Sequence, residues 1–222
     1  IMPRLVGSEM CIRDRLKSSC KKQWSQYTEH RFLGELVNNK LPTRKFKNYL
    51  IQDYIFLQQF LKILSLCAFK SKNYQEMQRY INFIFGIKNE INLHIGYCKK
   101  WKISQKLLNS IRVEKSNSDY TNYVLKIGKK GDNFDILTCL SPCIIGYGEI
   151  GYKLSKIKNW KKSKYRSWVE MYASKEYQEV AKDNINYLDK LKSENPSKKF
   201  SDLKKLFKKS TILERDFWET FV

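Results

Sequence analysis

The sequence predicts a single all-α domain, and three observations support this prediction. Only four prolines and nine glycines are spread over 222 residues, so signals for tight turns are sparse. Apolar residues recur at spacings of three and four through most of the chain, as they do on one face of a helix. Hydrophobic residues make up 42% of the chain and aromatic residues 14%, which is enough for a substantial core. No apolar run approaches the roughly 18 residues of a membrane span, so we expect no membrane-spanning helix.

The chain carries a formal net charge of +21. A charge of this size can indicate nucleic acid or an anionic surface as a partner. The lysines, however, are distributed singly over nearly every polar helix face, and Asn and Ile are abundant too, as in the product of an AT-rich coding sequence. We therefore expect no nucleic-acid partner. The six cysteines form no C-x-x-C pair, which argues against a zinc ribbon and predicts reduced thiols in a cytoplasmic protein.

Residues 1–15 look foreign to the rest of the chain. Residues 6–15 resemble a translated sequencing adaptor, and they lack the apolar run and the small-residue cleavage site of a signal peptide. We expect residues 1–15 to be an artefact that packs on nothing, and residues 16–222 to form the domain. The pattern of residues 16–38 is helical, and residues 38–42, which end in Leu-Pro, mark the first break.

The next predicted helix begins after Thr43, a plausible N-cap. Its apolar stripe contains one carboxylate, Asp53. A carboxylate on a buried face is costly unless it has a partner. Asp53 is therefore either part of a structural ion pair or faces a polar cavity, and spacing alone does not decide between them. The stripe is formed by Phe46, Leu50, Asp53, Leu57, Phe60 and Leu64.

Another long helix is predicted from residue 73 to about residue 100. Glu90 and His94 lie four residues apart on it, whereas a di-iron bundle repeats Glu-x-x-His at a spacing of three. The chain has only two histidines, so we expect no metal site, and we expect Glu90 and His94 to share a structural hydrogen bond. Residues 114–119 read as a loop.

The segment 141–152 reads as a helix with a proline near its start. Pro142 removes a backbone donor and should open the helix locally, next to Cys143. Gly146, Gly148 and Gly151 lower helix stability by roughly 1 kcal/mol each relative to alanine, which indicates close approach of another helix or a ligand. Cys143 is either a small buried core residue or a reactive thiol.

The last predicted helix also has one carboxylate, Glu214, on its apolar face. Two carboxylates, one cysteine beside a proline and several tyrosines could converge on one cavity in a helical bundle. Apolar walls would bind a flat ring, and a desolvated carboxyl group with a raised pKa could act as an acid at neutral pH. Periodicity leads no further than this.

Several motifs, in order along the chain, resemble those of the TenA/thiaminase II family from about residue 16 to the end. Each motif is modest alone, but their order and separations are specific. They are residues 41–46 and 52–57, Glu90 with His94, Pro142-Cys143 followed by residues 147–151, residues 165–172, and Glu214 with residues 217–218.

The resemblance implies a haem-oxygenase-like all-α bundle, commonly a homotetramer, that needs no metal or cofactor. It also implies an aminopyrimidine aminohydrolase of thiamin salvage. Such an enzyme replaces the amine of the aminomethyl group of 4-amino-5-aminomethyl-2-methylpyrimidine with a hydroxyl group and releases ammonia, and cleavage of thiamin would be a side or slower reaction.

The resemblance also implies residue roles. Cys143 would be the nucleophile that adds to the ring, as in the branch of the family that retains a cysteine. Asp53 would bind a ring nitrogen and the exocyclic amine, and Glu214 would protonate the departing amine and then help to activate water. The ring would be lined by Tyr120, Tyr147 and Tyr172, with Phe56 at a position where some members carry tyrosine.

Two alternatives remain. One is a haem-oxygenase-like or quinone-cofactor oxidase relative, for which His30 and His94 are poor candidates as ligands. The other is a basic nucleic-acid-binding or regulatory protein without enzymatic activity, which would form salt-sensitive complexes.

Overall fold

A computed structural model describes residues 11–222. The all-α prediction is confirmed, since these residues form helices and no strand. None of the helices in this part of the chain is long and apolar enough to span a membrane. The helices are α1 (Ile12–Ser18), α2 (Lys21–Thr28), α3 (Arg31–Val37), α4 (Thr43–Phe69), α5 (Tyr74–Lys100), α6 (Gln105–Ser110), α7 (Lys115–Lys130), α8 (Asn133–Leu154), α9 (Arg166–Ala173), α10 (Lys175–Glu194) and α11 (Phe200–Glu219), with a 3-10 turn at Trp160–Lys162.

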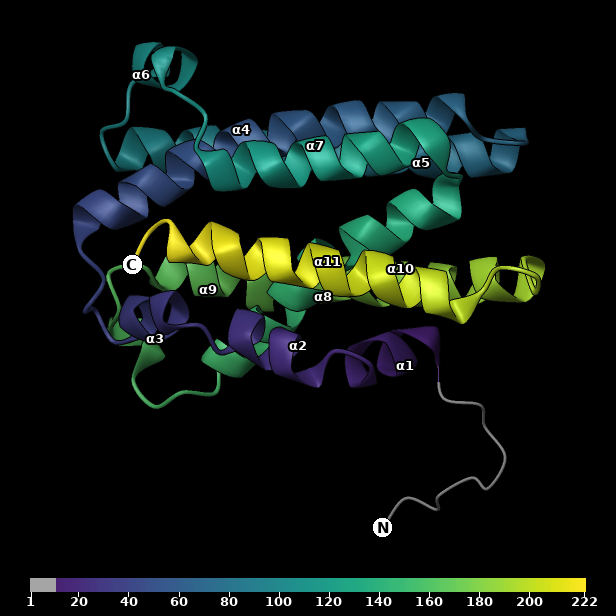
Figure 1. The fold of residues 1–222 in the computed structure, drawn as a ribbon. Coiled ribbons are helices and arrows are strands. Elements are labelled where there is room, and N and C mark those ends of the chain that lie inside the picture. The colour runs from purple at the N-terminus through teal and green to yellow at the C-terminus, as the bar shows by residue number, and fades with distance from the viewer. Residues whose placement is uncertain (1–10) are drawn as a thin grey trace.

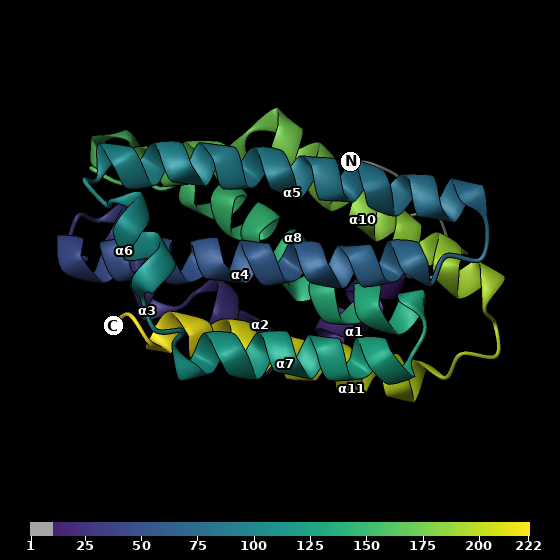
Figure 2. The same cartoon turned by 90° about the horizontal axis from the view of Figure 1, so that it is seen from above.

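The long helices are arranged in layers (Figure 1). Helices α5, α4 and α7 lie side by side in one layer, with α4 in the middle (Figure 2). Helices α8, α9, α10 and α11 form the next layer, and α1, α2 and α3 cover its other side. Helix α8 is therefore enclosed, and most of its side chains are buried, including Ser141 and Pro142, whereas Cys143 is partly buried.

Close packing around α8 explains its glycines. A Cβ atom on Gly146 would lie 2.3 Å from the ring of Tyr27 on α2, and one on Gly151 would lie 2.4 Å from the backbone of Tyr172 on α9. The predicted close approach to these glycines is confirmed, and of the two alternatives left open, another helix or a ligand, the neighbours are helices. Helix α8 is nevertheless continuous from Asn133 to Leu154, so Pro142 does not end it, and the Tyr27 hydroxyl donates to the Pro142 carbonyl at 3.3 Å.

The expectation that residues 1–15 pack on nothing is wrong for residues 11–15, while residues 1–10 lie outside the described part of the chain. The side chain of Ile12 is 3% exposed, and its backbone N–H donates to Asp189 on α10 at 2.7 Å. The Arg15 guanidinium lies 4.4 Å from the ring centre of Phe200. An adaptor-like sequence can still form the first turn of a helix when a side chain such as Ile12 reaches the core.

The helical pattern predicted for residues 16–38 is confirmed, and it is divided over α1, α2 and α3. His30 separates α2 from α3, where its Nδ1 accepts the N–H of Phe32. Two further predictions are corrected. The break at residues 38–42 is confirmed, but Pro42 occupies the N-cap position predicted for Thr43. Residues 115–119 are the first part of α7 rather than a loop.

Candidate functional site

A narrow pocket lies in the middle of the bundle, between the α4–α5 layer and the α8–α10 layer. Its wall is mainly apolar and aromatic, with side chains such as Phe56, Phe60, Phe83 and Leu137. Its polar groups are few and come from five helices. They are Asp53 on α4, Glu90 on α5, Cys143 and Tyr147 on α8, Tyr172 on α9 and Tyr177 on α10.

Asp53 is held at the pocket by a chain of hydrogen bonds. Its side chain is only 5% exposed, and its Oδ2 accepts a hydrogen bond from the Tyr49 hydroxyl at 3.2 Å. The indole N–H of Trp168 donates to the same hydroxyl at 2.9 Å, which directs the Tyr49 proton toward the carboxyl group. Burial raises the pKa of Asp53 to about 7, although the Tyr49 hydrogen bond opposes the rise. The sequence left the partner of Asp53 open, and the structure provides a tyrosine rather than a cation.

The predicted hydrogen bond between His94 and Glu90 is not formed, because His94 contacts other groups. Among the described residues its Nε2 lies 2.7 Å from the carbonyl oxygen of Leu50, and its Nδ1 lies 3.6 Å from Oδ2 of Asp53. Burial lowers the pKa of His94 to about 4. Helix α5 thus turns His94 toward α4, where it lies behind the carboxyl group of Asp53.

Cys143 is partly buried and lines the pocket. Burial raises the pKa of its thiol well above the usual value, and the nearby carboxyl groups of Glu214, Glu90 and Asp53 raise it further. The empty pocket therefore favours the thiol form, and a nucleophilic role requires that the proton leave as the sulfur reacts.

Glu214 is 2% exposed and lies behind Cys143 rather than in the pocket wall. Burial raises its pKa to about 8, and the charge of Asp53 adds to the rise, whereas hydrogen bonding with Tyr120 and Cys143 opposes it. Its Oε1 has no hydrogen-bond partner of normal geometry among residues 11–222. The Tyr120 ring packs against Phe56, with 5.1 Å between the ring centres.

The structure therefore brings the residues singled out from the sequence together. Asp53, Cys143, Tyr147, Tyr172 and Phe56 line the pocket, and Glu214 and Tyr120 lie directly behind it. The catalytic and binding roles assigned to them remain predictions.

Sequence reasoning missed two groups in the pocket wall. Glu90 lines the pocket, and burial raises its pKa to about 8, with a further rise from the charge of Asp53. The signal in the sequence is the position of Glu90 one helical turn before His94, but this spacing predicts only a structural hydrogen bond between the two residues. Tyr177 near the start of α10 also lines the pocket, and no pattern in the sequence singled it out.

This arrangement favours a small ring with a polar edge. No lysine or arginine is among the described residues that line the pocket, and no cluster of three His, Cys, Asp or Glu residues with metal-binding geometry occurs in the described part of the chain. A site with acids and aromatic rings suits a neutral or cationic heterocycle with N–H donors. A thiol and acids with pKa values near neutrality can carry out covalent and proton-transfer steps.

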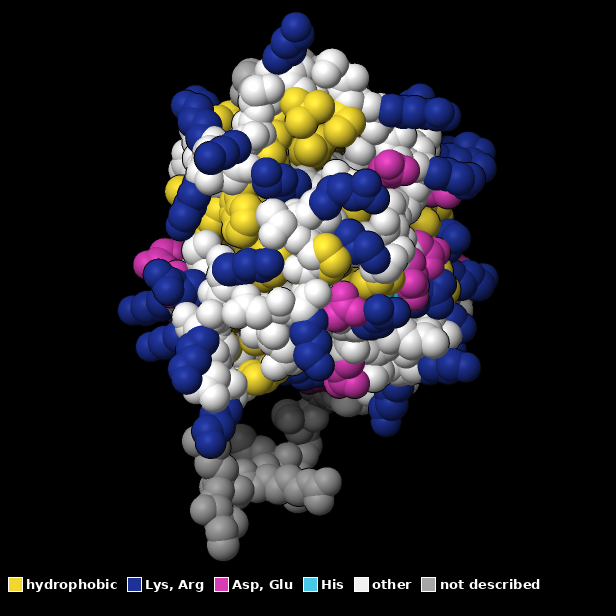
Figure 3. All heavy atoms as spheres, turned by 90° about the vertical axis from the view of Figure 1, so that its left-hand side faces the viewer, with side chains coloured by type: hydrophobic (Ala, Val, Ile, Leu, Met, Phe, Trp, Pro, Cys, Tyr) yellow, Lys and Arg dark blue, Asp and Glu magenta, His cyan; other side chains and the backbone are white. Residues whose placement is uncertain are grey.

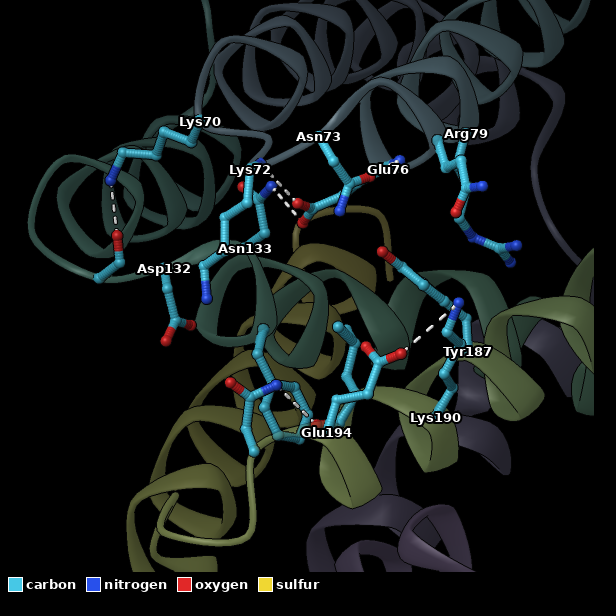
Figure 4. Close-up of a pocket in the computed structure, with 15 residues that line it drawn as sticks. Lys70, Lys72, Asn73, Glu76, Arg79, Asp132, Asn133, Tyr187, Lys190 and Glu194 are labelled. Atoms are coloured by element: carbon cyan, nitrogen blue, oxygen red, sulfur yellow. Dashed lines mark hydrogen bonds and ion pairs between the residues drawn. The ribbon is translucent and has the colours of Figure 1, made fainter.

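A second hollow lies at one end of the bundle, where the α4–α5 and α7–α8 turns meet the end of α10 (Figure 4). It is a polar groove, and we call it the end groove. The Nζ of Lys70 donates to the carbonyl oxygens of Gly128 and Gly131 at 2.5 Å each. Glu76 accepts from the Asn133 amide at 2.8 Å. Lys70 and Glu76 thus have partners within the protein.

Known proteins resemble this chain over nearly its whole length. Aminopyrimidine aminohydrolases from Helicobacter pylori and Halalkalibacterium halodurans are 30% and 29% identical to it, covering 95% and 88% of this chain and 98% and 88% of theirs. A solved structure described as a TenA family transcription regulator from Silicibacter has a TM-score of 0.86 at 33% identity, with 94% of this chain and 95% of that chain covered. A Shewanella denitrificans domain with a heme oxygenase-like fold has a TM-score of 0.74 at 13% identity, with 96% and 93% covered, which confirms the predicted fold.

The family resemblance predicted from the sequence is confirmed at the level of the whole domain. A family model described as TENA/THI-4/PQQC matches residues 17–222, which includes every helix that contributes to the pocket. This chain therefore belongs to the TENA/THI-4/PQQC family.

Proposed function

We propose that this protein is an aminopyrimidine aminohydrolase that converts 4-amino-5-aminomethyl-2-methylpyrimidine into its hydroxymethyl analogue and releases ammonia. One observation carries the proposal: the Cys143 thiol lies in an aromatic pocket beside the desolvated carboxyl groups of Asp53, Glu90 and Glu214. Two relatives of similar length carry the name aminopyrimidine aminohydrolase, which supports the same activity here.

The proposed reaction begins when the S–H bond of Cys143 adds across a C=N bond of the ring. Sulfur bonds to the carbon and the proton passes to the ring nitrogen, where Asp53 stabilises it. Electrons from that nitrogen then expel the amine of the aminomethyl group, which takes a proton from Glu214 and leaves as ammonia. Water adds to the exposed methylene carbon and returns a proton to Glu214. Loss of the sulfur, with its proton, restores the ring.

The aromatic side chains provide binding surfaces for the ring. The rings of Tyr147 and Tyr172 lie 4.7 Å apart between centres, at an angle of 62°. Together with Phe56 they form walls that a flat heterocycle can contact on its face and its edge. Tyr120 supports Phe56 and lies near Glu214, so it acts from behind the wall.

The test is ammonia release by the purified protein from the aminomethylpyrimidine, with thiamin as the second substrate. We expect ammonia from the aminomethylpyrimidine, and slower cleavage of thiamin detected as its free thiazole. Absence of product from both compounds, with a folded protein, would reject the proposal.

A regulatory role is the second candidate, because the solved structure from Silicibacter is described as a transcription regulator. Figure 3 favours the enzyme over a DNA-binding regulator, because the lysine and arginine side chains on the face shown are scattered and mixed with acidic and apolar groups. Binding to duplex DNA that weakens steeply with salt, without ammonia release, would favour regulation.

The histidines give little support to a haem or quinone-cofactor relative. His30 Nδ1 accepts a backbone N–H, and its Nε2 lies 3.1 Å from Glu219. His94 is held between Leu50 and Asp53. Haem absorbance in the purified protein would revive this alternative.

We also propose a cytoplasmic homotetramer. The six cysteines make no disulfide in residues 11–222, as in proteins of a reducing compartment. Helix α5 packs mainly on α4 and leaves Phe85 and Leu93 exposed at 56% and 61%, so its outer face is available to another copy. Sedimentation equilibrium measures the oligomeric state, and a monomer at micromolar concentration would count against the tetramer.

A further inference from the structure

His94 presents an unpaired ring nitrogen to a carboxyl group. Its Nε2 lies 2.7 Å from the Leu50 carbonyl oxygen, which can only accept, so Nε2 carries the hydrogen. In the neutral ring, Nδ1 is then a bare acceptor, 3.6 Å from Oδ2 of Asp53. An ionised carboxylate would also be an acceptor. Two acceptors facing each other in a buried space repel, unless one proton lies between them.

The neighbouring groups favour a neutral pair with the proton on Asp53. His94 is 3% exposed and Asp53 is 5% exposed, so neither charge is solvated. The Tyr49 hydroxyl, oriented by the Trp168 N–H, donates to the same Oδ2 and opposes loss of the charge, but it is a neutral donor and does not replace a cation. No described side chain offers Asp53 a cation in place of the proton. The other titratable groups facing Asp53 or the pocket are Glu90 and Cys98 on α5, Cys143 and Tyr147 on α8, Tyr172 on α9, Tyr177 on α10 and Glu214 on α11.

We propose that His94 is a positioning residue whose bare Nδ1 keeps a proton on Asp53, so that this carboxyl group meets its ligand as a neutral acid. A neutral acid presents one donor and one acceptor side by side. At 3.6 Å the contact to Nδ1 is longer than a hydrogen bond, so an acceptor on a ligand that comes closer can take the Asp53 proton instead.

This inference rests on the proposed function for the identity of the ligand. In a 4-aminopyrimidine, a ring nitrogen that accepts lies next to an amine that donates. A neutral carboxyl group complements both, whereas a carboxylate would repel the lone pair of the ring nitrogen. As Cys143 adds to the ring, Asp53 can pass this proton to the ring nitrogen and take up the thiol proton in its place, so that the S–H bond adds across the C=N bond and Asp53 ends the step as it began.

The first test does not depend on catalysis. The chain has two histidines, so long-range ¹H–¹⁵N NMR spectra of the whole protein contain two imidazole patterns, and a His30→Gln variant assigns them. We expect His94 to remain neutral with hydrogen on Nε2 between about pH 5 and pH 8. Its Nδ1 signal should nevertheless shift as Asp53 loses its proton, and this step should vanish in Asp53→Asn. A His94 that titrates like a free imidazole, or a step that persists in Asp53→Asn, would overturn the proposal.

The second test separates positioning from a merely structural role. In His94→Gln, the side-chain amide can still donate to the Leu50 carbonyl, but the acceptor for the Asp53 proton is lost. The pKa of Asp53 should therefore fall, and with it the pH up to which the neutral acid persists. At about pH 5.5 the variant and the wild type should have nearly the same kcat/KM. At higher pH the variant should fall behind, by up to about tenfold for each unit by which the pKa of Asp53 is lowered.

His30→Gln is the matched control, because it makes the same substitution far from the pocket and should give a ratio that does not change with pH. A His94→Gln defect that is equal at all pH values would mean that His94 is only structural. If the wild type releases no ammonia, the proposed function fails, while the NMR test still decides the state of the Asp53–His94 pair.

Discussion

The central pocket and the end groove both lie between α5, α8 and α10, yet the surroundings of their charged groups differ. The end groove is the larger space, about 540 Å³ against about 50 Å³ for the pocket. In the end groove, Arg79 pairs with Asp183, and Lys190 lies 3.6 Å from Glu194. In the pocket, burial raises the pKa values of Asp53, Glu90 and Glu214 to about 7, 8 and 8.

The difference indicates where chemistry can occur. A carboxylate with a cation and water around it is stable as an anion and has little tendency to exchange protons near neutral pH. A carboxyl group that is buried without a cation keeps its proton up to neutral pH, and it can give that proton to a substrate. Volume alone would have selected the end groove, whereas desolvation selects the pocket.

The largest effect is expected from Cys143→Ala. If the sulfur forms a bond to the ring, its loss should reduce kcat for ammonia release by about a thousandfold or more, because only binding and acid–base assistance remain. Binding of the hydroxymethyl product, measured by calorimetry, should persist because the aromatic walls are intact.

Cys139→Ala is the matched control for that experiment. Cys139 lies about one turn earlier on α8, is fully buried and is absent from the pocket wall. We expect it to lower stability by about 1 kcal/mol through a small cavity and to leave kcat almost unchanged. Equal activity of the two alanine variants would rule out covalent catalysis by Cys143.

Glu214→Gln should produce the next largest effect. The amide cannot donate an acidic proton to the departing amine, so we expect kcat to fall by about a hundredfold, within the range typical of a lost general acid. Substrate binding should change little, since glutamine has nearly the same size and shape as glutamate. A variant with wild-type kcat would remove Glu214 from the mechanism.

The same variant has a predicted effect on stability with a defined sign. Because the pKa of Glu214 is about 8 in the folded protein and about 4.5 ordinarily, its contribution to stability is present below about pH 4.5 and is lost as pH rises toward 8. Glutamine cannot ionise, so Glu214→Gln does not lose this contribution. Its free energy of unfolding relative to that of the wild type should therefore be about 1–3 kcal/mol higher at pH 8 than at pH 5, as measured by urea unfolding. A uniform loss of stability would instead support a structural role for Glu214.

Much of this site could be predicted because its residues break the helical pattern. Asp53 and Glu214 are single acids on apolar stripes, and Cys143 follows a proline within a helix, so each stood out along one element. The family resemblance then predicted that these three residues belong to one active site. The helix ends at residues 38–42 were also predictable, because Pro42 follows a cluster of polar residues.

What the sequence did not reveal depends on contacts between elements. His94 was paired with Glu90 because they share a helix face, but its hydrogen bond goes to a backbone carbonyl on α4, which no side-chain pattern encodes. No pattern in the sequence singles out Tyr49, whose hydroxyl lies between the Trp168 N–H and the Asp53 carboxyl group. Residues 11–15 were set aside for their origin, although Ile12 completes the core.

The smallest effect is expected from Glu194→Gln, which makes in the end groove the same chemical change that Glu214→Gln makes behind the pocket. Glu194 and Lys190 form an i, i+4 pair whose side chains are 53% and 61% exposed, so water and salt already screen their attraction. Losing the charge should change stability by less than about 0.5 kcal/mol and kcat by less than about twofold. The urea midpoint should also shift equally at pH 5 and pH 8, unlike that of Glu214→Gln. A large loss of turnover in Glu194→Gln would mean that the end groove takes part in the reaction, and that desolvation is the wrong criterion for separating these two sites.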